Sequence, residues 1–191
     1  IREHTRYSIE TLERESVLRA ESRASASAIV HRNPFDVTGY PRLRWKWRVE
    51  NVYRKGNASS KEGDDYPLRI YVLFEYDPEK ASAVERAKYG LARAIYGEYP
   101  PHSALNYIWA SREDEGGVLT NPYASNAKMI VLQNGRQNLG RWIVEERNVV
   151  EDYRRAFGTD PPPRATLGIM NDSDNTKEAS VAYVGFIEVY R

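Results

Sequence analysis

The eight residues from Arg42 to Val49 alternate strictly between basic and apolar side chains. Successive side chains of a β-strand point to opposite faces, so an extended chain places all the apolar residues of this segment on one face. These residues are Leu43, Trp45, Trp47 and Val49. We expect both tryptophans in a hydrophobic core. The basic residues form a row on the opposite face, which either meets solvent or lines a groove for an anionic or polar ligand. They are Arg42, Arg44, Lys46 and Arg48.

Further segments have the alternation and the β-branched and aromatic content of strands. They are residues 7–12, 16–21, 25–31, 68–76, 105–111, 128–133, 142–148, 165–170 and 179–190. We expect the first three to form a meander, and residues 33–36 and 38–41 to form turns. Residues 80–96 and 149–157 have helical patterns, the second ending at Gly158. About ten strands without a βαβ rhythm predict a mainly all-β fold: an antiparallel two-sheet β-sandwich of the jelly-roll type with one inserted helix and a short second helix.

Length and composition exclude several classes of protein. The 191 residues fit one domain, and we expect a single jelly-roll-like domain over residues 1–191. The net charge of +1 gives no overall field for a polyanion, so we expect no nucleic-acid partner. The absence of cysteine excludes disulfides and a cysteine nucleophile. No segment approaches the roughly 18 apolar residues of a membrane span. Because residues 1–4 contain neither methionine nor a hydrophobic signal core, we expect a shortened chain, produced by signal-peptide removal or by truncation.

Six groups of short segments, in order over nearly the whole chain, form a recognisable set. They are Ser25-Ala26-Ser27; Leu43-Arg44-Trp45-Lys46-Trp47; Gly63-Asp64-Asp65 leading into Arg69-Ile70-Tyr71-Val72; Leu105-Asn106-Tyr107-Ile108-Trp109; Glu146-Arg147-Asn148-Val149 with Asp152-Tyr153 and Phe157-Gly158; and Asp172-Ser173-Asp174-Asn175-Thr176. In these segments the sequence resembles a family of bacterial proteins catalogued as domain of unknown function 3047. The resemblance implies a commonly exported, periplasmic or extracellular protein whose jelly roll is related in shape to carbohydrate-binding modules and lectin-like sandwiches. It implies no catalytic residue.

One polar loop places acidic residues directly before a predicted strand. Asp64 and Asp65 lead into a strand that carries Arg69 and Tyr71. Loops held by a rigid sheet are common places for polar recognition. Because adjacent strand residues point to opposite faces, only one of the two carboxylates would face a given cleft. The alternative is structural: one carboxylate pairs with Lys61 or Arg69, and the other caps the turn.

Flat aromatic side chains beside hydrogen-bonding groups suit stacking on sugar rings. Tyr107 and Trp109 share one face of their predicted strand, as Arg69 and Tyr71 do on theirs. We predict that these side chains, with part of the basic row and the acidic pair, bind a polysaccharide or oligosaccharide. The predicted ligand-binding residues are Arg44, Lys46, Asp64, Asp65, Arg69, Tyr71, Tyr107 and Trp109. The basic members favour glycans that carry uronates, because arginine binds carboxylates through two hydrogen bonds.

A second polar loop offers alternating side-chain oxygens, the donors that calcium prefers. The candidate metal ligands are Asp172, Asp174 and Asn175. The loop lacks the glycine and the final glutamate of an EF-hand. Its alternative role is a tight turn held by side-chain to backbone hydrogen bonds. We expect no cofactor, and calcium at this loop would have a structural role.

Three functional hypotheses follow. The first is a noncatalytic carbohydrate-binding or cell-envelope-associated module. The second is a lyase-like enzyme acting on anionic polysaccharide, in which Tyr71 or His31 abstracts a proton while Arg69 neutralises the carboxylate. The third is a protein-interaction module that uses the helix at 80–96 as its contact surface. No motif of nucleophilic, dinucleotide or phosphate chemistry favours another enzyme class, and the catalytic residues, if any, are unknown.

Overall fold

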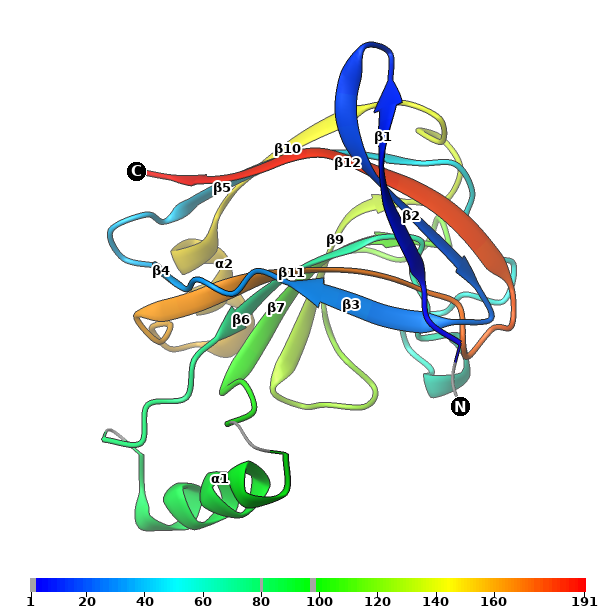
Figure 1. Ribbon diagram of the computed structural model, residues 1–191. Helices are drawn as coiled ribbons and strands as arrows, with labels where there is room; N and C mark the ends of the chain where they lie inside the picture. Colours follow the sequence, from blue (N-terminus) through cyan, green and yellow to red (C-terminus); the bar gives the residue numbers. More distant parts are fainter. Residues whose placement is uncertain (1–2, 80, 97–98) are drawn as a thin grey trace.

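Two facing β-sheets make up most of the structure, a computed structural model that describes residues 3–79, 81–96 and 99–191 (Figure 1). The five-stranded sheet has the spatial order β1 (Arg6–Leu12), β2 (Glu15–Arg23), β12 (Ala179–Tyr190), β5 (Arg42–Val49), β10 (Ile143–Asn148). The seven-stranded sheet has the order β3 (Ala26–Val30), β11 (Arg164–Asp172), β6 (Arg69–Phe74), β7 (Ser103–Ala110), β9 (Ala127–Asn134), β8 (Val118–Thr120), with β4 (Phe35–Asp36) also paired to β11. The predicted β-sandwich of the jelly-roll type, with one inserted helix and a short second helix, is confirmed.

Four details of the strands differ from the prediction. The first three strands do not form a meander: β1 pairs with β2, whereas β3 pairs with β11 in the other sheet. The change of sheet follows Ala24, whose left-handed φ of 48° turns the chain away from β2. Strands β7 and β9 are parallel, because the segment between them crosses back and contributes β8. Strand β4 lies where only a turn was expected, and β8 was not predicted.

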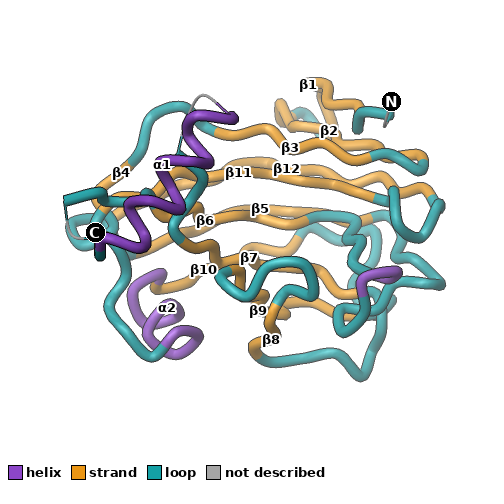
Figure 2. Tube along the Cα trace, turned by 90° about the horizontal axis from the view of Figure 1, so that it is seen from below, coloured by secondary structure: helices purple, strands orange, loops and turns teal. Residues whose placement is uncertain are grey.

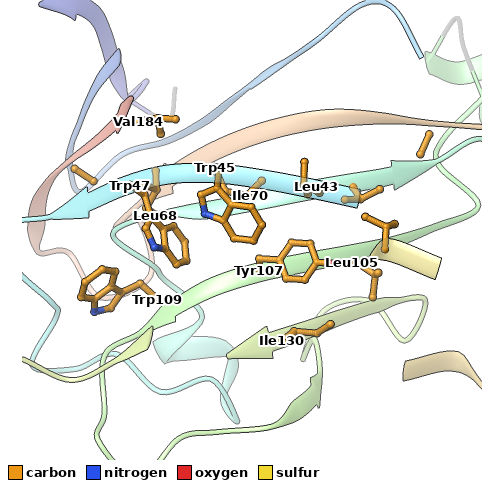
Figure 3. Close-up of a cluster of buried hydrophobic side chains, with 14 of the residues drawn as sticks. Leu43, Trp45, Trp47, Leu68, Ile70, Leu105, Tyr107, Trp109, Ile130 and Val184 are labelled. Carbon is orange, nitrogen blue, oxygen red and sulfur yellow. The ribbon is translucent and has the colours of Figure 1, made fainter. Parts of the chain in front are cut away.

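The core between the sheets contains the apolar face of β5, as predicted. Leu43, Trp45 and Trp47 are fully buried. The opposing rings come from β7: the ring centroids of Trp45 and Tyr107 are 5.1 Å apart, and those of Trp47 and Trp109 are 5.7 Å apart. Figure 3 shows the two pairs meeting between the sheets. Aromatic rings from both sheets therefore pack against one another at the centre of the sandwich.

The two helices have sequence-encoded ends. Helix α2 (Val149–Phe157) begins after Asn148, whose side chain accepts hydrogen bonds from two backbone N–H groups. It ends at Gly158, as predicted, and the φ of Gly158 is left-handed at 75°. Helix α1 (Ala83–Tyr96) begins later than expected, because Ser82 and Glu85 form a capping box with reciprocal side-chain to backbone hydrogen bonds. The predicted start at Lys80 lies outside the described residues.

Helix α1 lies apart from the sandwich, below the seven-stranded sheet in Figure 1, and the view in Figure 2 places it across the end of that sheet. Its Tyr89 ring stacks on Tyr76, which follows β6, with the ring centroids 3.9 Å apart. No helix among the described residues has the length and apolar character needed to cross a membrane.

Candidate functional site

The two polar loops predicted from the sequence meet in the structure. A short 3-10 helix (Lys61–Gly63) leads into Asp64 and Asp65, next to the loop after β11. The Asp65 carboxylate accepts hydrogen bonds from the backbone N–H groups of Asn175 (3.2 Å) and Thr176 (2.5 Å). Asp65 is 1% exposed. It therefore joins two segments that are 110 residues apart in the chain.

A buried ion pair lies beside this junction. The Arg69 Nε donates to Asp172 Oδ1 at 3.1 Å, and its Nη2 donates to the other oxygen of the same carboxylate. Arg69 Nη1 lies 3.7 Å from Asp64 Oδ1. The Asp64 carboxylate also accepts from Asn121 Nδ2 at 3.0 Å. Arg69 is thus enclosed by acidic groups and is only 4% exposed, so it offers no guanidinium to an external ligand.

Carboxylates from both loops lie close enough together to hold a metal ion. Ligand oxygens of Asp65, Asp172 and Asp174 all lie within 4.8 Å of one another. Asn175, the third predicted ligand, accepts a hydrogen bond from the Tyr123 hydroxyl on its side-chain oxygen at 3.3 Å. The carboxylates of Asp65 and Asp172 already accept backbone and guanidinium hydrogen bonds from the protein itself. Calcium at this loop stays a prediction.

Burial controls the titration of this cluster. It raises the pKa of Asp172 from 3.8 to about 7; Arg69 opposes the rise and the charge of Asp65 adds to it. Burial also raises the pKa of Asp64, again against the effect of Arg69. One guanidinium does not compensate fully for several buried carboxylates. The cluster is therefore least favourable when all of its acids are ionised.

We predict that this cluster makes the fold less stable as the pH rises. The folded-state pKa of Asp172 exceeds its unfolded value, so its contribution is complete below about pH 4 and is lost as the pH passes about 7. The free energy of unfolding should fall by about 2 kcal/mol between about pH 5 and about pH 7. Urea unfolding at several pH values measures this fall. The Asp172→Asn variant should be less stable but should show a flatter profile; an unchanged slope would contradict the assignment.

The aromatic part of the predicted site is wrong. Tyr107 and Trp109 are fully buried and point into the core, because Tyr107 pairs with the inward-facing Ile70, while Arg69 pairs with Ile108 on the other face. The Tyr107 hydroxyl donates to Asp152 at 2.9 Å, and Trp109 Nε1 donates to the Gly135 carbonyl at 3.2 Å. These polar edges are satisfied inside the protein. The two rings therefore stabilise the sandwich and do not share a groove with Arg69 and Tyr71.

The proposed proton acceptors lie in separate places. Tyr71 is half-buried on the outer face of the seven-stranded sheet, and burial raises its pKa to about 12. His31 follows β3, is exposed, and has Nδ1 3.0 Å from the Asn33 carbonyl oxygen. It lies at an apolar crevice of about 480 Å³ lined partly by Ile169 and Val189. Tyr71 does lie beside Arg69, whose guanidinium carbon is 5.9 Å from the centroid of the Tyr71 ring, but that guanidinium already donates to both oxygens of Asp172.

The basic row of β5 lies on the outer face of the five-stranded sheet, but carboxylates neutralise it. Its four members form ion pairs, Arg42–Glu146 (3.8 Å), Arg44–Glu188 (2.7 Å), Lys46–Glu15 (2.6 Å) and Arg48–Glu50 (2.6 Å). Two partners come from neighbouring strands, and Glu15 comes from the start of β2. This outer face is therefore a mixed-charge surface, which removes the expected preference for uronates.

Aromatic side chains that the sequence reasoning missed lie on the same outer face. They are Trp142, Tyr183, Phe186 and Tyr190, all partly exposed. Strict alternation along β12 would place Tyr183 and Phe186 on opposite faces. A β-bulge between Val184 and Phe186 shifts the register and brings both rings to the outer face. The signal in the sequence is that the aromatic residues of this strand occupy an odd position before Gly185 (Tyr183) and even positions after it (Phe186 and Tyr190).

Basic side chains lie against these rings. Lys46 Nζ is 4.9 Å from the centroid of the Trp142 ring, and the Trp142 and Tyr183 centroids are 6.4 Å apart. The Arg44 guanidinium is 5.6 Å from the Phe186 centroid and 5.7 Å from the Tyr190 centroid. We call the outer-face set Arg44, Lys46, Trp142, Tyr183, Phe186, Glu188 and Tyr190 the aromatic face. It combines flat apolar rings with charged hydrogen-bonding groups, the chemistry that a sugar ring requires.

Comparison with known proteins found similar sandwiches and one sequence family. Endoglucanase 3 of family GH12 from Trichoderma harzianum shares 10% identity at a TM-score of 0.44, with 96% of this chain and 81% of that chain covered. The winged bean acidic lectin complexed with methyl-α-D-galactose shares 10% identity at a TM-score of 0.38, with 97% and 92% covered. No curated protein matches the sequence. The sequence profile described as "Protein of unknown function (DUF3047)" matches residues 1–188, and the chain belongs to this family.

Proposed function

We propose that the protein is a noncatalytic carbohydrate-binding module and that its ligand binds to the aromatic face. The observation that carries the proposal is the partly exposed pair Trp142 and Tyr183 beside Lys46 on the outer side of the five-stranded sheet. The two solved structures with similar sandwiches have TM-scores below 0.5, so the proposal rests on this surface alone. The periplasmic or extracellular location and the bacterial source stay predictions.

The charges of the aromatic face favour a neutral glycan. Every cation of the β5 row has a carboxylate partner, so a ligand carboxylate would compete with existing ion pairs. Sugar hydroxyls, in contrast, donate to carboxylates and accept from ammonium or guanidinium groups, so they can bind without breaking the ion pairs. The turn of the β1–β2 hairpin bounds one side of the face, because Glu13 pairs with Arg48 at 3.1 Å and Glu15 with Lys46. A ligand would therefore lie along β12 and β5.

The lyase hypothesis brings Arg69 and Tyr71 together, as the structure does, but it lacks two groups that the chemistry needs. It needs a guanidinium that can meet a substrate carboxylate, whereas both Asp172 oxygens already accept from Arg69. It also needs a base that is deprotonated near neutral pH, whereas the pKa of Tyr71 is raised to about 12. The protein-interaction hypothesis has one supporting observation. Val84 and Leu91, on the projecting helix α1, are 79% and 66% exposed.

A thermal-shift screen against neutral and uronate-bearing oligosaccharides tests the proposal. A ligand present at about one hundred times its dissociation constant should add about 2.7 kcal/mol of stability, a shift of roughly 5 to 10 °C for a chain of this size. We expect the shift with neutral sugars. Trp142→Ala and Tyr183→Ala should each weaken binding at least about tenfold, because each removes a stacking ring. Titration calorimetry with the best sugar measures this loss.

A tyrosine outside the aromatic face supplies the control. Tyr123 is 57% exposed, and its hydroxyl oxygen lies 3.1 Å from the Lys61 carbonyl oxygen and 3.3 Å from Asn175 Oδ1, beside the polar loops. Tyr123→Ala should bind the sugar as the unchanged protein does. If Trp142→Ala and Tyr183→Ala both bind the sugar with full affinity, the ligand does not bind to the aromatic face. The absence of a shift with every sugar would refute the carbohydrate function itself.

A further inference from the structure

An apolar crevice of about 480 Å³ opens between the two sheets, at the edge of the sandwich that β3 forms. Leu167 and Ile169 of β11 line it from one sheet, and Ile187 and Val189 of β12 line it from the other. Figure 1 shows β12 above β3 and β11. These four side chains are partly buried and pack against the central core. The crevice therefore reaches the core of the sandwich from outside.

The crevice is open because β2 accompanies β12 over only part of its length. The pairing of the two strands ends at Val184, next to the bulge. Beyond it, β5 is the only strand among the described residues that pairs with β12. In Figure 1 the β1–β2 hairpin rises away from the sandwich at this point. Since β3 is the edge strand of the other sheet, no further strand of the described chain closes the gap.

The polar groups of the crevice lie together at its rim. They belong to His31 and Asn33, which follow the edge strand β3. His31 Nδ1 is 3.0 Å from the Asn33 carbonyl oxygen. A carbonyl oxygen only accepts, so Nδ1 carries the hydrogen, and Nε2 is the ring nitrogen that can meet a ligand. Ile29, also at the rim, is 39% exposed, so the crevice is accessible from solvent. Among the described residues that line it, none is aspartate, glutamate, lysine or arginine.

An apolar interior with polar groups at the rim suits a ligand that has one polar end. Small-molecule pockets typically have volumes of about 300–1,000 Å³ and combine apolar walls with a few polar groups that fix the orientation of the ligand. A peptide between these two walls of side chains would bury backbone N–H and C=O groups without partners, and a sugar would bury hydroxyls in the same way. An alkyl chain has no such groups. Its binding also removes the partly exposed core side chains from water.

We propose that the crevice binds a single alkyl chain with an oxygen-bearing head group, as in a fatty acid or its glycerol ester. The chain packs between the apolar side chains of β11 and β12, and the head group lies at the rim beside His31 and Asn33. The free acid and the ester share this chemistry, and the choice of probes separates them. Because Ile187 and Val189 point inward from β12, this site is distinct from the aromatic face on the outer side and independent of the carbohydrate proposal.

Titration calorimetry of the whole protein tests the proposal with octanoate, decanoate and dodecanoate, each below its micelle concentration. From octanoate to decanoate the affinity should rise about fourfold for each added methylene, because each one buries further apolar surface. Dodecanedioate is the matched control. It carries a second carboxylate at the far end of the chain and should not bind, because that charge would be buried without a partner. Binding of dodecanoate but not of glycerol monododecanoate indicates a free fatty acid, and binding of the ester as well indicates an acyl lipid.

A pair of matched variants locates the binding site. Ile29→Trp places a larger ring at the rim and should weaken dodecanoate binding at least about tenfold. Ile9→Trp changes an exposed residue of β1 outside the lining and should bind normally. Both variants should melt close to the unchanged protein, since each replaces a side chain at the surface. Failure of all three acids to bind, equal binding of dodecanedioate, or equal affinities of the two variants would each overturn the proposal. A dimer of the unchanged protein that Ile29→Trp dissociates would also overturn it, because a second copy would then cover the crevice.

Discussion

Replacing Arg69 by methionine is expected to destabilise the fold by about 3–5 kcal/mol. The change removes the guanidinium group. That group donates to both carboxylate oxygens of Asp172 and lies 3.7 Å from a carboxylate oxygen of Asp64. Both carboxylates would then be buried without a positive partner. The free energy of unfolding in urea, measured at neutral pH, reports this cost.

Arg44→Met is the matched control, since it breaks an ion pair of similar length at the surface. Arg44 and Glu188 have side chains that are 44% and 50% exposed, so the loss should be below about 1 kcal/mol. The double variant Arg69→Met with Asp172→Leu should recover much of the lost stability, because apolar groups of similar size replace a buried pair without a desolvation penalty. Equal small losses in Arg69→Met and Arg44→Met would contradict the assignment.

The periodicity of the sequence identified the residues that share a strand face, and for β5 it also identified the buried face. Only one face of β5 is apolar, so the choice was unambiguous. Strand β7 is buried on both faces, because a second small cluster that includes Tyr66 and Met129 covers Ile108 from outside. Alternation alone could not show that Tyr107 and Trp109 point inward.

Partners far apart in the sequence were the second source of error. Arg44 meets Glu188 through the pairing of β5 with β12, and Asp65 meets the loop after β11. Neither contact has a local signal in the sequence. The basic row of β5 therefore looked cationic although carboxylates neutralise it, and the two polar loops looked like separate sites although they meet. The bulge at Gly185 did have a local signal, because the aromatic residues change from odd to even positions there. This bulge brings the rings of the aromatic face to one side of the sheet.

The second large effect is expected from Trp109→Ala. Trp109 is fully buried, contacts the Trp47 ring and donates to the Gly135 carbonyl, so its removal should cost about 3–5 kcal/mol of unfolding free energy.

The matched variant Trp142→Ala should show the opposite pattern, a small loss of stability and a large loss of sugar binding, because Trp142 is partly exposed on the aromatic face. It should cost about 1 kcal/mol or less and abolish most sugar binding. Trp109→Ala, studied below its lowered melting temperature, should keep the affinity of the unchanged protein, since its ring touches no outer surface. Urea unfolding gives the unfolding free energy of each variant, and sugar titration gives the dissociation constant of each. A binding loss in Trp109→Ala together with full binding in Trp142→Ala would return the ligand to the originally predicted residues and refute the aromatic face.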